Sequence, residues 1–86
     1  MTNENILNYN VTGRQSFAEF ITLLRNDLIS SPEKWENNTL ERFLAALAAY
    51  SADIQGYYYN MGQNVNADEA SWSIFADMLK GATMYE

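Results

Sequence analysis

The run TLERFLAALAAYSADIQGYYY, residues 39–59, predicts a long helix in the middle of the chain. Its large apolar residues recur at the three- and four-residue spacing of one helical face, and five alanines between them favour a helix strongly. Asn38 or Thr39 can cap the first turn. Because glycine costs about 1 kcal/mol against alanine inside a helix, we expect a break or bend near Gly56. The tyrosines that follow then form either the last turn of this helix or a separate short helix.

An amphipathic helix is also predicted before this run. Ser16 and Glu19 have the spacing of a capping box, in which each side chain satisfies a free amide of the first turn. Apolar residues then recur at helical spacing up to Ser30, and Pro32 ends the helix, because proline disfavours helical geometry in the residue before it. Ser31 as a cap and Pro32 at the first position suit one further short turn.

The last predicted helix follows a polar loop. Residues 60–70 are rich in asparagine and contain a glycine, which suits turns, and a cap on Asn66 or Ser71 starts the helix. The alternating polar residues of the loop have some likeness to a calcium-binding loop. That pattern needs glycine at its sixth position and glutamate at its twelfth, where this chain has Val65 and Ser71, so we expect no metal here.

Three main helices and one or two short ones predict an all-α fold, a small compact helical bundle of three to five helices. Residues 14–86 are expected to form its single domain, because a chain of 86 residues suffices for one only. Residues 1–13 are expected to be a flexible or loosely packed arm, in which apolar residues such as Ile6 and Val11 either pack on the body or fray. The predicted core consists of Phe17, Phe20, Ile21, Leu24, Leu28, Trp35, Leu40, Phe43, Leu44, Leu47, Ile54, Trp72, Phe75 and Leu79.

The composition narrows the classes of function. The chain has no cysteine and no histidine, which removes disulfides, the usual general base and the commonest metal ligands. We therefore expect a protein that is not an enzyme and has no catalytic residue, metal or cofactor. The formal net charge of −6 would repel nucleic acids and anionic membranes, so neither is an expected partner. The same charge suits a basic protein partner, and it also fits a small protein that is merely kept soluble.

The cellular location is predicted from the absence of a membrane span and of a secretory signal. No stretch approaches the roughly 20 apolar residues of a membrane span. Residues 1–6 lack the basic start and apolar run of a secretory signal, so we expect a cytoplasmic location. Two matches to the glycosylation pattern, at Asn10 and Asn37, are then matches by chance.

The three consecutive tyrosines cannot all face one core, because successive side chains of a helix are about 100° apart. At least one ring should reach solvent or a partner, while the others can pack in the core with their hydroxyls at its rim. Asp53 lies one turn before Tyr57, so its carboxylate and that ring share a face. Since tyrosine is favoured at binding hot spots, we predict a protein-binding site formed by Asp53, Tyr57, Tyr58 and Tyr59.

The alanine-rich face of the middle helix has two interpretations. Small residues let a neighbouring helix approach closely within one molecule. They also leave a flat apolar surface through which copies of the chain can associate. We favour the first, because the apolar stripe beside this face already packs on a core. A structural or scaffolding protein that self-associates through this helix is the alternative to a protein-binding module, and a homo-oligomer is compatible with the sequence.

A set of short motifs runs through residues 16–86: Trp35-Glu36-Asn37, Thr39-Leu40-Glu41, Phe43-Leu44, Ala46-Leu47, Gly56-Tyr57-Tyr58, Ser71-Trp72, Phe75-Ala76-Asp77, Leu79 and Tyr85-Glu86. Together they resemble an uncharacterised family of short acidic bacterial proteins, a domain of unknown function. The resemblance implies a bacterial single-domain protein and implies no activity.

A looser similarity is to the immunity proteins of nuclease colicins, which are acidic four-helix proteins of similar length. An acidic residue followed by paired tyrosines grips the nuclease in that family, and Asp53, Tyr57 and Tyr58 are similar in type and position. The spacing differs, Gly56 intervenes, and the second helix is rich in alanine instead of acidic residues. This similarity implies an immunity-type inhibitor of a basic toxin or nuclease.

Overall fold

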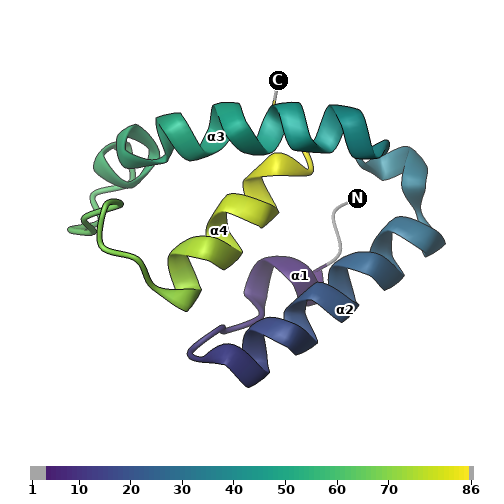
Figure 1. The fold of residues 1–86 in the computed structure, drawn as a ribbon, viewed down its shortest axis with the longest axis horizontal. Helices are drawn as coiled ribbons and strands as arrows, with labels where there is room; N and C mark the ends of the chain where they lie inside the picture. Colours follow the sequence, from purple (N-terminus) through teal and green to yellow (C-terminus); the bar gives the residue numbers. More distant parts are fainter. Residues whose placement is uncertain (1–3, 86) are drawn as a thin grey trace.

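The structure is a computed structural model that describes residues 4–85, with side chains from Ile6 onward. No strand occurs in this part of the chain, so the predicted all-α fold is confirmed. None of the helices between residues 4 and 85 combines the length and the apolar character needed to cross a membrane. The elements, shown in Figure 1, are α1 (Glu4–Asn8), α2 (Arg14–Ser30), the 3-10 helix η1 (Pro32–Lys34), α3 (Leu40–Asn60) and α4 (Trp72–Ala82).

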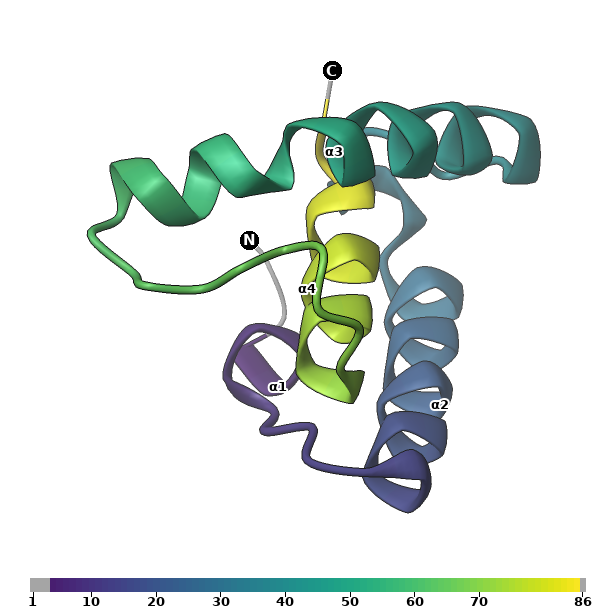
Figure 2. The same cartoon turned by 60° about the vertical axis from the view of Figure 1, so that its left-hand side comes forward.

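Helix α4 is the central element of the bundle. Figure 2 shows it between α1 and α2, with α3 across one of its ends. Both α3 and α2 pack against α4, and α1 packs against α2. At Gly81 the approach of α3 is so close that an added Cβ would lie 2.1 Å from Cε2 of Tyr50. Glycine is therefore required where α4 passes under α3.

The start of α2 differs from the prediction. Gly13 takes the N-cap position, and Ser16 lies in the first turn. There its Oγ accepts hydrogen bonds from the N–H groups of Thr12 (2.9 Å) and Gly13 (3.1 Å). The carboxylate of Glu19 accepts from the hydroxyl of Tyr9 instead of capping the helix. The prediction of Ser16 as the cap is thus wrong by three residues. A hydroxyl that reaches back toward the preceding amides satisfies free amides as well as one that reaches forward.

Helix α3 begins as predicted and ends later. Oγ1 of Thr39 accepts from the N–H of Arg42 at 3.3 Å, so Thr39 is the cap. The helix continues through Gly56 without a break, so of the two predicted alternatives the tyrosines form its last turns and not a separate helix. The cost of one glycine is small against the packing of the residues around it.

The end of α3 is a Schellman motif centred on Gly62. Its φ of +71° is the left-handed conformation that glycine adopts without steric cost. The N–H of Gly62 donates to the carbonyl of Tyr59 at 3.1 Å, and that of Gln63 donates to the carbonyl of Tyr58 at 2.9 Å. The stop signal is therefore Gly62, six residues beyond Gly56, where we predicted a break or bend.

The loop between α3 and α4 is held by a side chain of α3. Nε2 of Gln55 donates to the carbonyl of Val65 at 2.8 Å, and Oε1 accepts from the N–H of Ala67 at 2.8 Å. Of the two predicted caps for α4, Ser71 is the one used, since its Oγ accepts from the amide three residues on. Asn66 instead closes a turn within the loop.

The chain before α2 contributes to the core. Ile6 and Val11 are both only 3% exposed. Nζ of Lys80 donates to the carbonyls of Leu7 (3.5 Å) and Tyr9 (3.4 Å), which fastens this segment to α4. Residues 1–3 of the predicted arm and residue 86 of the predicted domain lie outside the described residues. The domain boundary at residue 13 stays a prediction.

The core consists of two clusters. One is formed by Ile6, Val11, Phe20, Leu24, Trp35 and Ala76. The other is formed by Ile54, Tyr58 and Ile74, with Tyr50 and Met78 packed against it. In α4 the prediction is right in part: Leu79 packs against the first cluster as expected, but Ile74 is buried in place of Trp72 and Phe75.

Five predicted core residues are exposed, and this part of the prediction is wrong. They are Ile21, Leu40, Leu44, Trp72 and Phe75. Ile21, Leu40 and Leu44 are exposed because α2 and α3 both pack on α4 and diverge from one another, so these two helices do not cover each other fully (Figure 1). Trp72 and Phe75 are exposed because α4 buries Ile74 and Ala76 instead. A periodic stripe predicts which face of a helix is apolar, but not whether another element covers it.

Candidate functional site

A hollow between the C-terminal half of α3 and α4 contains part of the predicted site. We call it the tyrosine cleft. Its volume is about 250 Å³, and its lining residues are Leu7, Tyr50, Tyr57, Gln63, Asp77, Lys80 and Gly81. Three elements distant in sequence meet here, so no local pattern could have placed the cleft.

Aromatic rings form one side of the tyrosine cleft. The ring of Tyr50 lies with its centroid 6.2 Å from that of Tyr57 and 5.0 Å from that of Tyr85, the second pair edge to face. Such pairs stabilise each other beyond the area they bury, by about 0.5–1.5 kcal/mol. The hydroxyl of Tyr85 donates in turn to Asp53, which raises the pKa of that hydroxyl. Asp53, Tyr85, Tyr50 and Tyr57 are therefore one connected surface.

The four predicted site residues are separated by the structure. Tyr57 is 42% exposed and lines the cleft, and Asp53, one helical turn before it, lies on the same side of α3 but outside the lining. Tyr58 is 1% exposed and belongs to the core. Tyr59 is 78% exposed and, about 200° around the helix from Tyr57, points to another side. The tyrosines are therefore divided between the core and the surface, as predicted. Of the four predicted site residues, only Asp53 and Tyr57 lie on one surface.

Tyr58 joins α3 to α4. Its hydroxyl donates to Oδ2 of Asp77 at 2.6 Å. Burial disfavours the charged phenolate, and the hydrogen bond to Asp77 favours the neutral hydroxyl, so the pKa of Tyr58 is raised well above its ordinary value. Burial likewise raises the pKa of Tyr50 to about 12, and the nearby Tyr57 and Asp77 add to the rise. Both hydroxyls are neutral donors at any physiological pH.

The charges around the tyrosine cleft favour a cation. Lys80 lies with Nζ 3.8 Å from Oδ1 of Asp77 and 5.6 Å from the centre of the Phe20 ring. Its ammonium group therefore offsets Asp77, and the carboxylate of Asp53 remains in excess at the edge of the connected surface. Within residues 4–85, no group of three or more acidic side chains is placed to hold a metal ion.

Comparison with known proteins gives one match. A family model described as "Family of unknown function (DUF7660)" matches residues 13–86. The chain belongs to this family. The predicted resemblance to an uncharacterised domain family is thus confirmed. Because the function of DUF7660 is unknown, membership in this family assigns no activity to the chain. No curated protein and no solved structure matches the chain. The similarity to colicin immunity proteins is supported by none of these comparisons and stays a hypothesis.

The motif Trp35-Glu36-Asn37, one of those that carry the family resemblance, has a structural role that the sequence did not reveal. Nε1 of Trp35 donates to Oδ2 of Asp27 at 2.7 Å, and both residues are buried. This hydrogen bond fixes η1 against α2. An unpaired carboxylate at this depth would be costly, so the indole N–H is the compensating partner for Asp27.

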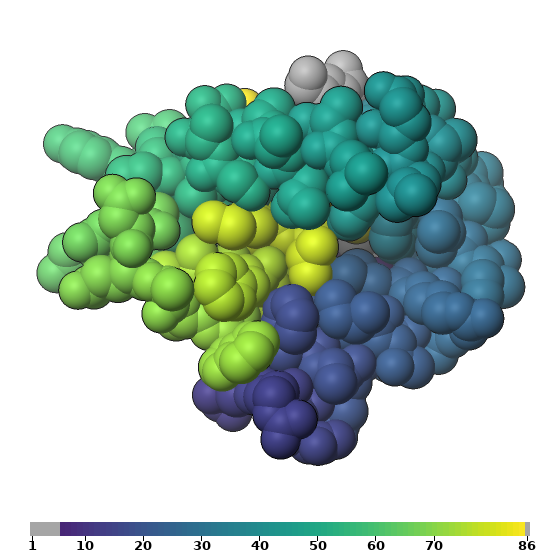
Figure 3. Space-filling view, in the orientation of Figure 1, coloured from purple at the N-terminus to yellow at the C-terminus, as the bar shows by residue number. Residues whose placement is uncertain are grey.

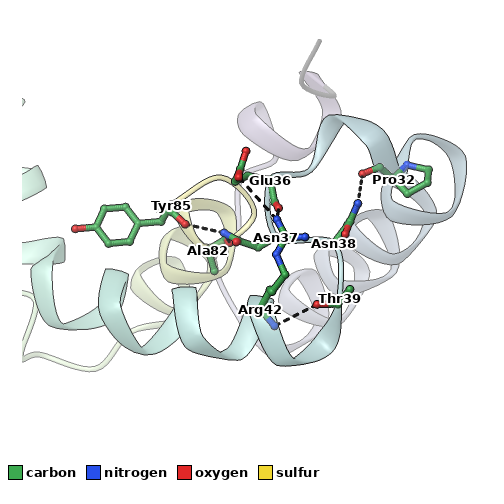
Figure 4. A network of polar contacts seen from close by, with 8 residues as sticks. All are labelled: Pro32, Glu36, Asn37, Asn38, Thr39, Arg42, Ala82 and Tyr85. Atoms are coloured by element: carbon green, nitrogen blue, oxygen red, sulfur yellow. Dashed lines mark hydrogen bonds and ion pairs between the residues drawn. The ribbon is translucent and has the colours of Figure 1, made fainter.

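Asn37 fastens the C-terminal segment of this DUF7660 member. Its Nδ2 donates to the carbonyls of Ala82 (2.9 Å) and Tyr85 (2.7 Å), as Figure 4 shows. Its own N–H donates to the carbonyl of Thr83 at 3.0 Å. These three bonds hold the chain after α4 and so place the Tyr85 ring beside Tyr50. The only signal in the sequence was an asparagine between a tryptophan and a helix cap.

The alanine-rich face of α3 is mostly uncovered. Ala46 is buried, while Ala45, Ala48, Ala49 and Ala52 are exposed. A shallow hollow of about 380 Å³ lies along part of this face. Our favoured interpretation, that the alanines allow close helix packing within the molecule, is therefore wrong for four of the five.

Proposed function

We propose that this protein is a non-enzymatic protein-binding module whose tyrosine cleft accepts a basic side chain of its partner. The observation that carries the proposal is the half-exposed ring of Tyr57 against Tyr50, with the Asp53 carboxylate on the same connected surface. Aromatic faces attract cations within about 6 Å of the ring centre. A carboxylate beside such faces adds charge complementarity for lysine or arginine.

The net charge of the chain supports the same choice of partner. At −6, the chain attracts basic proteins over distances of several ångströms and speeds their association when salt is low. An immunity-type inhibitor of a basic toxin or nuclease is the specific version of this proposal. A bacterial, cytoplasmic setting fits that role. Tyr57 supplies contact area at a small entropic cost, and Tyr58 supports it from beneath by joining α3 to α4.

The experiment is a capture from a bacterial lysate with three baits: the wild-type chain, Tyr57→Ala and Tyr59→Ala. Tyr59→Ala is the matched control, because it removes the same ring from the same helix on another side. We expect a basic protein that wild type and Tyr59→Ala retain, that Tyr57→Ala loses, and that added salt releases. A partner retained equally by Tyr57→Ala would contradict a role for the tyrosine cleft. Tyr58 is left intact, because its ring is part of the core.

A second candidate is a scaffolding protein that self-associates through the alanine-rich face of α3. The exposure of Ala45, Ala48 and Ala49 supports it, since a flat run of small residues lets two helices approach closely. Light scattering at increasing concentration tests it. Association that Ala49→Glu abolishes is the expected result, and a wild-type chain that stays monomeric removes the candidate.

A further inference from the structure

The carboxylate of Asp53 already has one hydrogen-bond partner within the chain. Its Oδ2 accepts from the hydroxyl of Tyr85. Its Oδ1 accepts from no donor among residues 6–85, and no lysine or arginine of these residues forms an ion pair with Asp53. Asp53 is exposed, so a ligand can reach Oδ1 from solvent. The carboxylate therefore offers an incoming cation one open oxygen and one occupied oxygen.

The hydroxyl of Tyr85 is held in this position by the tertiary structure. The Tyr85 ring lies edge to face against Tyr50, with centroids 5.0 Å apart. Asn37 holds the main chain of the segment, and Figure 4 shows the Tyr85 side chain extending from there toward the later turns of α3. On the face drawn in Figure 3, the last part of α4, in yellow, lies directly against the middle of α3. The bond to Asp53 raises the pKa of Tyr85, so the hydroxyl stays a protonated donor near neutral pH.

The open oxygen of Asp53 lies beside an accessible aromatic ring. Asp53 and Tyr57 are four residues apart on α3, which places their Cβ atoms about 5–6 Å apart on one face of the helix. The Tyr57 ring is 42% exposed. A cation gains from an aromatic face when it lies within about 6 Å of the ring centre. One positive charge can therefore contact both Oδ1 of Asp53 and the ring of Tyr57.

Lysine and arginine use a carboxylate in different ways. A guanidinium is planar, and its strongest arrangement pairs two parallel N–H groups with both carboxylate oxygens. An ammonium is a compact charge that needs one carboxylate oxygen and can leave its other donors to water. At Asp53, a guanidinium that pairs with both oxygens has to compete with the hydroxyl of Tyr85 for Oδ2. An ammonium that bonds to Oδ1 has no such competitor.

We infer that this surface selects lysine over arginine and that the hydroxyl of Tyr85 is the group that makes the selection. The inference rests on the proposed function and specifies which basic side chain the partner supplies. The lysine ammonium donates to Oδ1 of Asp53 and lies against the ring of Tyr57, while Tyr85 keeps its bond to Oδ2. Tyr85 is thus a specificity-determining residue that the three consecutive tyrosines of the sequence did not include.

The test is an NMR titration of the full chain with N-acetyl-lysine amide and with N-acetyl-arginine amide near neutral pH. The two probes have the same charge and the same backbone. Shifts of the amide signals of Asp53 and Tyr57 give the two dissociation constants. We expect the lysine probe to bind about threefold more tightly, which is the scale of one exposed charged hydrogen bond.

Tyr85→Phe is the deciding variant, because it frees Oδ2 of Asp53 and keeps the ring against Tyr50. The dissociation constant of the arginine probe should fall by about threefold, so that the preference disappears or reverses. Tyr9→Phe is the matched control. It also removes a hydroxyl that donates to a carboxylate, that of Glu19, outside the connected surface, and it should leave the preference unchanged.

The outcomes separate this inference from the proposed function. Equal binding of the two probes by the wild type, or a preference that survives Tyr85→Phe, overturns the selection of lysine. If Tyr57→Ala still abolishes binding in that case, the tyrosine cleft remains supported as a site for basic side chains. Binding that Tyr57→Ala leaves unchanged contradicts the proposed function itself. The absence of saturable shifts with either probe also overturns the inference, and the lysate capture then decides the proposed function separately.

Discussion

The two ends of α3 carry the same kind of amphipathic pattern and have opposite surroundings. At the C-terminal end, Ile54 and Tyr58 are buried against Ile74 of α4. At the N-terminal end, Leu40 and Leu44 are exposed. The difference is the position of α4, which meets the middle of α3 at Tyr50 and packs Ile74 against the second half of α3, so the first half of α3 extends beyond it (Figure 1). Burial therefore depends on where helices cross, and equal hydrophobicity does not imply equal burial.

The largest effect on stability should come from removing Tyr58, which joins the C-terminal end of α3 to α4. Tyr58→Ala deletes a 1% exposed ring and its bond to Asp77, and it should lower the free energy of unfolding by about 3–5 kcal/mol. Urea unfolding followed by circular dichroism measures this. Tyr59→Ala is the control and should change the free energy by about 0.5 kcal/mol or less. A similar loss for both variants would contradict the assignment of Tyr58 to the core.

A smaller effect is expected where α4 passes under α3. Gly81→Ala places a methyl group against the ring of Tyr50 and should cost about 1–3 kcal/mol of stability, because the ring or the helix must move. The cost should shrink in a Tyr50→Ala background, since the obstructing ring is then gone. Thermal unfolding of the four proteins in this double-mutant cycle measures the coupling. Strictly additive effects would show that the two residues do not meet.

Alkaline pH should weaken the same end of the molecule. The folded pKa of Tyr50 is about 12 and that of Tyr58 is also raised, against an ordinary value of 10.0. Both groups therefore contribute stability that is fully present below pH 10 and is lost as the pH rises through the folded values. We expect the urea midpoint to fall between pH 10 and about 12, and to fall less steeply in Tyr50→Phe. An unchanged slope in Tyr50→Phe would exclude this residue as the titrating group.

The smallest effect should be seen at the N-terminal end. Leu40→Ala removes a side chain that is 74% exposed, so the free energy of unfolding of the monomer should change by about 0.5 kcal/mol or less. Chemical unfolding at a concentration too low for association makes this measurement. A loss as large as that of Tyr58→Ala would mean that Leu40 is covered within one molecule, and the contrast between the two ends would disappear.

Prediction from the sequence succeeded where neighbouring residues decide the outcome. The caps at Thr39 and Ser71 follow from side chains that bond to nearby amides. The short turn starting at Pro32 follows from the fixed backbone angle of proline at a first helical position. Prediction failed where the same local signal is compatible with two structures. Ser16 bonds to preceding amides instead of following ones, and α3 continues through Gly56. Of the predicted site, only the exposure of at least one of the three tyrosines follows from helical geometry alone.

The tertiary structure decided which apolar stripe of each helix packs against another element. The sequence by itself determined an acidic all-α protein, the helices of its main body and at least one exposed tyrosine. It did not determine that Tyr58 is the buried one, that Tyr85 and Asp53 join Tyr57 beside Tyr50, or that Leu40 and Leu44 are left open. Those outcomes depend on contacts between residues far apart in the chain, such as Asn37 with Tyr85 and Tyr50 with Gly81. Local periodicity holds no information on such contacts, because it records the faces of each helix and not the angles at which helices cross.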